Sequence, residues 1–299
     1  MINAGFLTRV AFPDLQNLDK DWFMAPETFH ASEIVQFTIE LARTVGVLLQ
    51  QRPDALEVTT KSTVTDVVTQ MDQAAESALV SAISEQFPDD SILGEEGTSV
   101  AGTTNFQWVL DPLDGTVNYL YHLPAWAISI ARVNLSTGLT QVGVVHAPDL
   151  DRTYWASHGQ GAHLEHDEHL ISLHASECVT LEQALIGTGF GYEKKRRQAQ
   201  ARVLNSLLPQ VRDIRRIGSC AIDLCLVAEG ALDGFYERGV NPWDHSAGAL
   251  IAREAGAVVS GLHGHQESDE MIVVANPMLH PQLVQLLESV SADSDSAQR

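Results

Sequence analysis

The sequence predicts a protein of mixed α and β structure, with an α+β first half and an α/β second half that pack closely together. Long segments with a helical period come first, and short segments rich in Val, Ile and Trp follow them. Beyond about Leu181, short strand-like and helix-like segments alternate, which is typical of α/β units. The length of 299 residues suits one large domain or two modest ones. We expect a boundary near residues 165–175.

The first predicted helix begins at Ser32, a residue type suited to capping, and carries the acidic Glu33 in its first turn. Pro53 ends it. Five apolar residues recur at helical spacing on one face: Ile34, Phe37, Leu41, Val45 and Leu48. A second helix is predicted over residues 72–86, before Pro88.

Shorter elements are expected in the rest of the chain. Strands are predicted at 107–111, 127–133, 140–146, 153–156, 184–187 and 234–236. Helices are predicted at 194–208, 221–229, 244–255 and 278–290. The polar segment 158–174 holds five irregularly spaced histidines, which favours a solvated loop over a transition-metal site.

The domain organisation follows from these elements. Residues 1–31 show no period and are interpreted as an N-terminal extension, and residues 291–299 are expected to form a disordered tail. Between them we expect two subdomains, 32–170 and 171–290.

The net charge of −21 excludes several kinds of partner. Nucleic acid backbones and anionic membranes both require clustered Lys and Arg, so we expect neither as a direct partner. An acidic protein that acts on an anionic substrate would need a cation between the two, which makes a divalent metal the first cofactor to consider.

Cysteine usage and hydropathy indicate the compartment. Cys178, Cys220 and Cys225 form no C-x-x-C pair and are expected to be small buried residues. The sequence shows no apolar run typical of a signal peptide and no apolar stretch of about 18 residues or more. We therefore expect a soluble cytoplasmic protein.

The segment D-P-L-D-G-T, residues 111–116, is the most informative for chemistry. A strand is expected to end at Asp111, with Pro112 directing the chain out of the sheet. The carboxylates of Asp111 and Asp114, with the Leu113 carbonyl between them, offer the oxygen ligands that Mg²⁺ prefers. The N–H groups that follow, at a helix start, suit an anion. The alternative is an ordinary Asx-type turn.

Three other acidic segments have simple structural explanations when taken alone. Glu95 and Glu96 lie between glycines and could form a solvated loop. Asp244 opens an apolar helix and Asp72 opens the second predicted helix, so each would serve as an N-cap.

In combination and in this order, the four segments resemble the inositol monophosphatase family. The family patterns D-P-[IL]-D-G-T and W-D-x-x-A-G are intact at 111–116 and 243–248, as are G-E-E at 94–96 and D-x-V-T-x-x-D at 66–72. The resemblance extends from about Ile34 to about Leu287, and residues 185–261 are most similar to the bacterial inositol-1-monophosphatase branch. It implies a layered αβαβα sandwich, a dimer, two to three Mg²⁺ per subunit and inhibition by Li⁺.

The resemblance also implies the metal ligands and the groups that prepare the attacking water. Glu95, Asp111 and the Leu113 carbonyl would bind the first Mg²⁺, and Glu95 would also lie near a third, looser ion. The second Mg²⁺ would be bound by Asp111, Asp114 and Asp244. Asp72 and Thr116 would orient the water, and Glu96 would support the ligands from behind. Subdomain 32–170 would thus bind metal.

Subdomain 171–290 would contribute much of the substrate site. The residues that match substrate-contacting positions of the family are Asp114, Gly115, Thr116, Ser219, Cys220 (through its backbone), Glu237 and Asp244. Clustered carboxylates repel one another at about 1 kcal/mol per pair in water, and more in a cleft, so cations would be needed there. Two metals can clamp the entering and leaving oxygens of a phosphate ester.

The predicted function is therefore hydrolysis of a small polyol phosphate, myo-inositol 1-phosphate, by a water that the metal activates. Histidinol-phosphate phosphatase, fructose-1,6-bisphosphatase, bisphosphate nucleotidase and NADP phosphatase activities remain alternatives on the same site. Glu237 and the loop 187–192 favour inositol, because a carboxylate accepts hydrogen bonds from polyol hydroxyls, and no basic pocket for a second phosphate is evident.

Several other features are weighed against this prediction. The G-T-G-F-G segment at 187–191 lacks the rest of a dinucleotide fingerprint and is interpreted as a turn lining the cleft. The basic run 194–197 is interpreted as a solvated helix face, with a role in attracting phosphate or in subunit contacts as the alternative. Ser219 has no evident catalytic partners for a serine hydrolase. The non-enzyme alternative is a scaffold or transcription-accessory protein.

Overall fold

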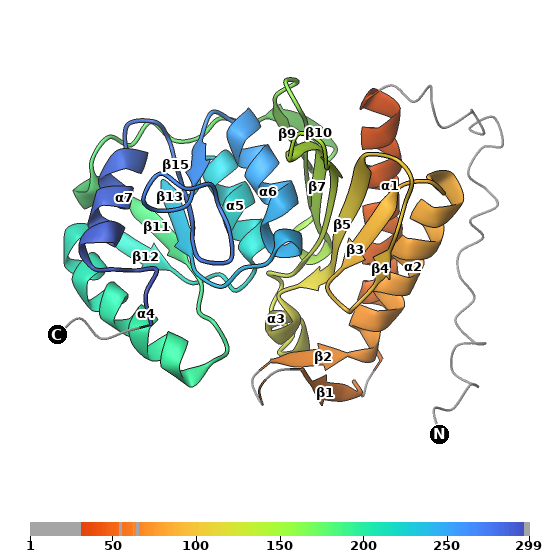
Figure 1. The fold of residues 1–299 in the computed structure, drawn as a ribbon, viewed down its shortest axis with the longest axis horizontal. Coiled ribbons are helices and arrows are strands. Elements are labelled where there is room, and N and C mark those ends of the chain that lie inside the picture. The colour runs from red at the N-terminus through yellow and green to blue at the C-terminus, as the bar shows by residue number, and fades with distance from the viewer. Residues whose placement is uncertain (1–30, 54–55, 62, 64–65, 296–299) are drawn as a thin grey trace.

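The computed structural model describes residues 31–53, 56–61, 63 and 66–295. These residues form five layers, α, β, α, β and α (Figure 1). Helices α1 (Ala31–Gln50) and α2 (Gln70–Gln86) cover one face of a large sheet. Helices α5 (Cys220–Ala228) and α6 (Pro242–Glu254) fill the space between the two sheets, and α4 (Lys194–Leu207) and α7 (His280–Ser289) cover the far face of the smaller sheet. The αβαβα sandwich is confirmed.

The large sheet has eight strands in the order β10-β9-β8-β7-β6-β5-β3-β4. Their bounds are β3 Ser91–Gly94, β4 Ser99–Val100, β5 Phe106–Asp114, β6 Ala127–Asn134, β7 Leu139–Ala147, β8 Arg152–Ser157, β9 Ala162–His166 and β10 His169–Ser172. Only β3 and β5 run parallel within it. A separate hairpin pairs β1 (Val58–Thr60) with β2 (Val67–Thr69).

The smaller sheet has five strands in the order β12-β11-β13-β15-β14. Their bounds are β11 Leu185–Thr188, β12 Asp213–Arg215, β13 Gly234–Glu237, β14 Val258–Ser260 and β15 Ile272–Ala275. A short helix α3 (Thr116–Leu120) follows β5, and 3₁₀ turns lie at Pro148–Leu150, Leu181–Gln183 and Leu208–Gln210.

The central helices join the two sheets into one core. A single cluster of buried apolar side chains contains residues from the large sheet, from α5 and α6, and from the smaller sheet. Helix α6 lies very close to β7, because a Cβ atom at Gly143 would be 2.8 Å from the Ala247 carbonyl oxygen. Glycine at this position therefore allows the central layer to contact the sheet directly.

The apolar face predicted for the first helix packs on the large sheet as expected, with Leu41 and Val45 buried in the outer core cluster. The helix begins at Ala31, one residue before the predicted start. The predicted extension 1–31 otherwise lies outside the described residues. Within the described part of the chain, no helix combines the length and the hydropathy that a membrane span needs.

The predicted end of the strand at Asp111 is wrong in a way that matters for the site. Pro112 does not end β5, because the strand pairs Asp111 with Ser129 and then resumes at Asp114, opposite Ala127. Pro112, which has no N–H to donate, lies in the resulting bulge, where the sheet does not need one.

The predicted N-caps Asp72 and Asp244 are also misplaced. Thr69 caps α2 and Asn241 caps α6, and each aspartate is the third residue of its helix. Each carboxylate accepts a hydrogen bond from the N–H of its cap residue, at 2.8 Å from Thr69 and 2.5 Å from Asn241. Both helices thus begin with the reciprocal arrangement of a capping box.

Two segments expected to be irregular are ordered. The histidine-rich segment 158–174 contains the hairpin β9–β10, because Asp167 and Glu168 adopt the positive φ angles, 48° and 62°, that a two-residue hairpin turn needs. In the predicted disordered tail 291–299, the described residues 291–295 pack on the protein: Ala292 is buried and Asp295 pairs with Arg238.

Candidate active site

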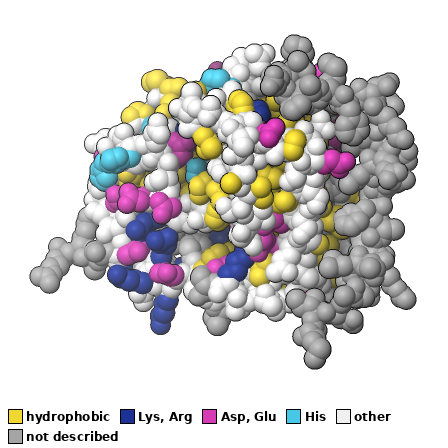
Figure 2. All heavy atoms as spheres, turned by 45° about the vertical axis from the view of Figure 1, so that its right-hand side comes forward, with side chains coloured by type: hydrophobic (Ala, Val, Ile, Leu, Met, Phe, Trp, Pro, Cys, Tyr) yellow, Lys and Arg dark blue, Asp and Glu magenta, His cyan; other side chains and the backbone are white. Residues whose placement is uncertain are grey.

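A cavity of about 390 Å³ opens where the ends of β3 and β5 meet the starts of α3, α5 and α6. Acidic and basic side chains lie side by side around a hollow on the face shown in Figure 2. The volume falls within the usual range for small-molecule sites, about 300–1,000 Å³. The cavity is therefore large enough for a small ligand and open enough for exchange.

The structure brings most of the sequence-predicted site residues into this cavity. Those that line it are Glu95, Asp111, Leu113, Asp114, Gly115, Thr116, Ser219, Cys220, Glu237 and Asp244. Asp72 and Glu96 do not line the cavity but contact residues that do. Gly189, Phe190 and Gly191 line the cavity as expected, whereas Gly187 and Thr188, which were interpreted as part of the same turn, belong to β11.

The fold anchors three of the aspartates through hydrogen bonds to one carboxylate oxygen. Asp111 Oδ1 accepts from the Leu113 N–H at 3.0 Å, across the bulge in β5. Asp114 Oδ2 accepts from the Ser219 hydroxyl at 2.6 Å and the Ala221 N–H at 2.7 Å. Asp244 Oδ2 accepts from Asn241, as described above. These carboxylates therefore keep fixed positions relative to one another.

The carboxylates are held together against their mutual repulsion. Burial raises the pKa of Asp111 well above its ordinary value, and Glu95, Asp114 and Asp244 raise it further. Burial likewise raises the pKa of Asp244, with Asp114 and Glu95 adding to the effect. Burial raises the pKa of Asp114 to about 6, although hydrogen bonds from Ser219 and Ala221 oppose the shift. A nearby positive charge would therefore favour the ionised form of these carboxylates.

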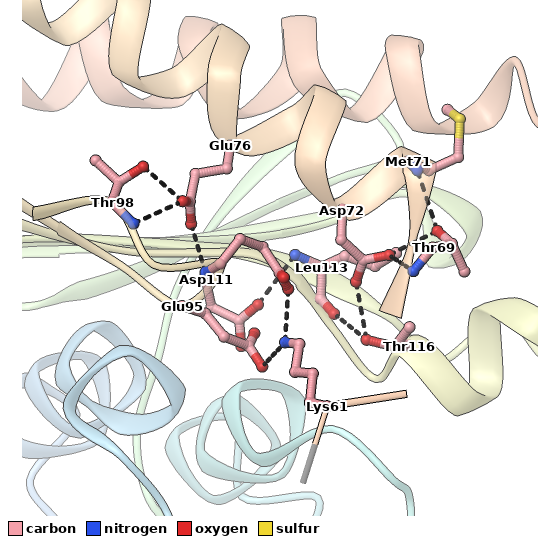
Figure 3. Close-up of polar contacts among 11 residues, drawn as sticks. Lys61, Thr69, Met71, Asp72, Glu76, Glu95, Thr98, Asp111, Leu113 and Thr116 are labelled. Atoms are coloured by element: carbon pink, nitrogen blue, oxygen red, sulfur yellow. Dashed lines mark hydrogen bonds and ion pairs between the residues drawn. The ribbon is translucent and has the colours of Figure 1, made fainter. Parts of the chain in front are cut away.

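Lys61, beside the β1–β2 hairpin, supplies one positive charge (Figure 3). Its Nζ atom donates to Glu95 Oε1 at 2.8 Å and to Glu96 Oε1 at 2.6 Å. Burial lowers the pKa of Lys61, but the two glutamates outweigh it and raise the pKa above its ordinary value. Burial raises the pKa of Glu96 to about 7, and Lys61 counteracts the shift. One ammonium group on two glutamates leaves the three aspartates uncompensated.

The donor set fits divalent cations such as Mg²⁺. Carboxylate oxygens from Glu95, Asp111, Asp114 and Asp244 and the Leu113 carbonyl all come from residues that line one cavity. Oxygen ligands of this kind suit hard cations, and several buried acidic groups require their charge.

Asp72 and Thr116 meet behind the carboxylate cluster. Thr116 Oγ1 lies 3.1 Å from Asp72 Oδ1 and 3.1 Å from the Leu113 carbonyl oxygen. The second oxygen of Asp72 accepts from the N–H and hydroxyl of Thr69 at 2.8 and 2.6 Å. Gly115, which adopts φ of 89°, turns the chain between these groups, and a Cβ there would be 2.9 Å from the Ala125 carbonyl.

The opposite wall of the cavity carries Glu237, at the end of β13. A Cβ atom at Gly189 would lie 2.0 Å from Glu237 Oε1, so the glycine leaves the room that this carboxylate occupies. Burial raises the pKa of Glu237 to about 7, although Arg216 lowers it. Cys220 is buried, and burial raises its thiol pKa well above the ordinary value, which does not suit a thiolate nucleophile.

The cavity contains residues that the sequence analysis missed. These are Lys61, Asp66, Tyr192, Glu193, Arg196, Arg216, Asp223, Val240, Asn241 and Trp243, with Gly218 and Gly239. The sequence showed no evident basic pocket for a second phosphate, but Lys61, Arg196 and Arg216, from separate elements that only the fold brings together, all line the cavity. The basic run 194–197 offered a signal, since one of its residues, Arg196, lines the site.

Comparisons with known proteins agree with this fold and identify the family. The model of the inositol monophosphatase family matches residues 30–292. An inositol-1-monophosphatase of Mycobacterium leprae is 47% identical over 207 residues, covering 68% of this chain and 70% of the relative. The Nus factor SuhB of Escherichia coli is 37% identical over 252 residues, covering 82% of this chain and 91% of the relative.

Solved structures show the same likeness. A Thermotoga maritima IMPase superposes with a TM-score of 0.78 at 31% identity, over 87% of this chain and 98% of that one. The chain belongs to the inositol monophosphatase family.

Proposed function

We propose that this protein hydrolyses a small polyol phosphate, myo-inositol 1-phosphate, to inositol and inorganic phosphate in the presence of Mg²⁺. The observation that carries the proposal is the convergence of Glu95, Asp111, Asp114 and Asp244 in one cavity, with Asp72 and Thr116 directly behind them. The similarity to an inositol-1-monophosphatase at 47% identity supports the substrate.

The cations have candidate ligands in this chain. Glu95, Asp111 and the Leu113 carbonyl would hold one, Asp111, Asp114 and Asp244 a second, and Glu95 would contribute to a third. Bound divalent cations supply Lewis acidity to phosphoryl oxygens and lower the pKa of water towards neutrality.

The chain's own residues prepare the reacting groups. When Thr116 Oγ1 donates its hydrogen to Asp72 Oδ1, a lone pair on the threonine oxygen can accept a hydrogen bond from a water molecule in the cavity. The Thr116 hydroxyl then lies between Asp72 and that water, and the Asp72 carboxylate can stabilise transfer of a proton from the water to the threonine oxygen. Glu96, bonded to Lys61, supports the position of the neighbouring ligand Glu95.

The substrate would lie between the acidic cluster and Glu237. The polyol hydroxyls would form hydrogen bonds with the Glu237 carboxylate, which accepts, and with Ser219 and the Cys220 backbone. Gly115 and Thr116 would contact the phosphate. Asp114 and Asp244 would contact both substrate and cation. We further propose that the protein is dimeric, sensitive to Li⁺ and cytoplasmic.

A panel of phosphate esters tests the substrate. Phosphate release is measured from inositol 1-phosphate, histidinol phosphate, fructose 1,6-bisphosphate, adenosine 3′,5′-bisphosphate and NADP⁺, each with Mg²⁺, EDTA or added Li⁺. We expect Mg²⁺-dependent release from inositol 1-phosphate in preference to the others. Preference for a bisphosphate would overturn the substrate and assign the cavity residues Arg196 and Arg216 to the second phosphate.

A second function deserves its own test because of the likeness to the Escherichia coli Nus factor SuhB. With a net charge of −21, a protein partner fits better than direct contact with nucleic acid. Binding of the purified protein to bacterial RNA polymerase, measured with and without RNA, tests this role. Binding that requires RNA would contradict a direct protein contact.

A further inference from the structure

Glu76 is a buried carboxylate of α2 that serves none of the roles described so far. It lies one helical turn after Asp72 and is 3% exposed. Its Oε2 atom accepts from the Glu96 N–H at 2.8 Å, and its Oε1 atom accepts from the Thr98 N–H at 3.1 Å and the Thr98 hydroxyl at 2.6 Å (Figure 3). All three donors belong to the short turn that follows β3 and carries Glu95.

An ion pair does not explain the burial of Glu76. Among the ion pairs of the described residues, none involves Glu76. The carboxylate is therefore buried on N–H and O–H donors alone, next to a turn that already bears two glutamates. Burying an unpaired charge is unfavourable. A requirement for strong, fixed hydrogen bonds to the turn explains why a carboxylate is present, because bonds to a charged acceptor are the stronger ones.

The chain makes room for this contact at Gly94. A Cβ atom at this position would lie 2.3 Å from Glu76 Oε2, which would displace the carboxylate from the Glu96 N–H. Gly94 also begins the turn, since its N–H donates to the Thr98 carbonyl at 2.9 Å. Glycine and carboxylate therefore fit as a pair.

We infer that Glu76 is a positioning residue for the cation site, holding the turn from Glu95 to Thr98 so that the Glu95 carboxylate keeps its position among the proposed ligands that line the cavity. Asp72, one turn earlier on the same helix, holds Thr116 in a similar way through a side-chain hydrogen bond. Helix α2 thus contacts the turn that carries Glu95 and the segment that carries Asp111 and Asp114, whereas Asp244, the remaining proposed ligand, comes from α6. The inference rests on the proposed function.

The test compares Mg²⁺ binding by the wild type, Glu76→Gln and a matched control, Asp90→Asn. Glutamine keeps the size of Glu76, but its NH₂ group cannot accept from the turn. Asp90 is equally buried, 4% exposed, and bonds Arg132 and Trp108 at the other end of β3, away from the cavity. Mg²⁺ affinity is measured without substrate, by calorimetry and by the rise of Tm with Mg²⁺ concentration.

We expect Glu76→Gln to weaken Mg²⁺ binding about 10-fold or more, the usual effect of losing a group that orients a metal ligand. Its Tm in EDTA should stay close to that of the wild type. The Mg²⁺ concentration for half-maximal phosphate release should rise by the same factor, with little change of rate at saturating Mg²⁺. Asp90→Asn should lower Tm and leave Mg²⁺ affinity unchanged.

Unchanged Mg²⁺ affinity in folded Glu76→Gln would overturn the inference. If that variant does not fold, Gly94→Ala and Thr98→Val replace it, and normal Mg²⁺ affinity in both would overturn the inference equally. A wild type that binds Mg²⁺ but releases no phosphate from any ester would overturn the proposed function alone. A wild type that binds no Mg²⁺ would overturn both.

Discussion

Thr116 Oγ1 lies 3.1 Å from Asp72 Oδ1, although the two residues are 44 positions apart in the chain. The same hydroxyl is 3.1 Å from the Leu113 carbonyl, and a threonine has only one hydrogen to donate. A cation on the Leu113 carbonyl would therefore direct that hydrogen towards Asp72. Occupation of the metal site would in this way set the hydrogen-bond direction of the pair that faces the water.

Asp72→Asn should reduce kcat for inositol 1-phosphate by about 100-fold or more, the usual contribution of a positioned acid–base group. The amide would donate to Thr116 Oγ1 and reverse the hydrogen bond, so the threonine could no longer pass a proton from the water to a carboxylate at position 72. Calorimetry should show Mg²⁺ binding within a few-fold of the wild type. Full activity in this variant would remove the pair from the mechanism.

Asp111→Asn should abolish turnover and leave the fold intact. In EDTA its Tm should equal or exceed that of the wild type, because the substitution removes one buried charge from four clustered acidic groups that repel one another. Added Mg²⁺ should raise the Tm of the wild type and have little effect on the variant. Mg²⁺-dependent turnover by the variant would contradict the role of Asp111 as a ligand shared by two ions.

Glu237→Gln should impair inositol 1-phosphate hydrolysis more than p-nitrophenyl phosphate hydrolysis. Glu237 lines the cavity where we propose that the polyol hydroxyls bind, and the nitrophenyl ester has no hydroxyls to bind there. The measurement is kcat/KM for both esters in wild type and variant. Equal losses on the two would remove Glu237 from substrate discrimination.

Acid should destabilise the protein through His146, which lies far from the site on β7. Burial, together with Arg43 on α1, lowers the pKa of His146 from 6.5 to about 4, against the opposing effects of a backbone hydrogen bond and Asp151. The folded state therefore keeps His146 neutral while the unfolded state binds a proton. Its contribution to stability is complete above about pH 6.5 and is lost as the pH falls towards 4.

The expected loss of unfolding free energy between pH 7 and pH 5 is about 2 kcal/mol from this residue. The measurement is urea unfolding of the wild type and His146→Gln at several pH values, both in EDTA. The difference between the two pH dependences of the unfolding free energy gives the contribution of His146. Parallel dependences would show that His146 titrates normally in the fold.

Local patterns were sufficient to predict the apolar face of α1 and the division into an α+β first half and an α/β second half. The layered sandwich and the places of Glu95 and Asp244 in the acidic cluster were predicted from the resemblance to the family. Asp111 and Asp114 were found because both lie in one short motif, whose geometry depends on neighbouring residues.

Other features depend on contacts that no local pattern contains. Lys61 and Arg216 reach the cavity from distant parts of the chain. The starts of α2 and α6 were misplaced because an acidic residue suits both the cap and the third helical position. The spacing T-x-x-D at Thr69 and N-x-x-D at Asn241 carried the missing signal.

The position of α6 between the two sheets has a consequence for the modularity of the protein. This helix delivers Asp244 to a cavity whose other proposed cation ligands lie in β5 or directly after β3, while its flank packs against β7. The two halves of the chain therefore cannot rotate as separate bodies without moving Asp244 away from Asp111. A chain split near the subdomain boundary would lack a complete ligand set in either fragment, so activity would return only when the fragments reassemble.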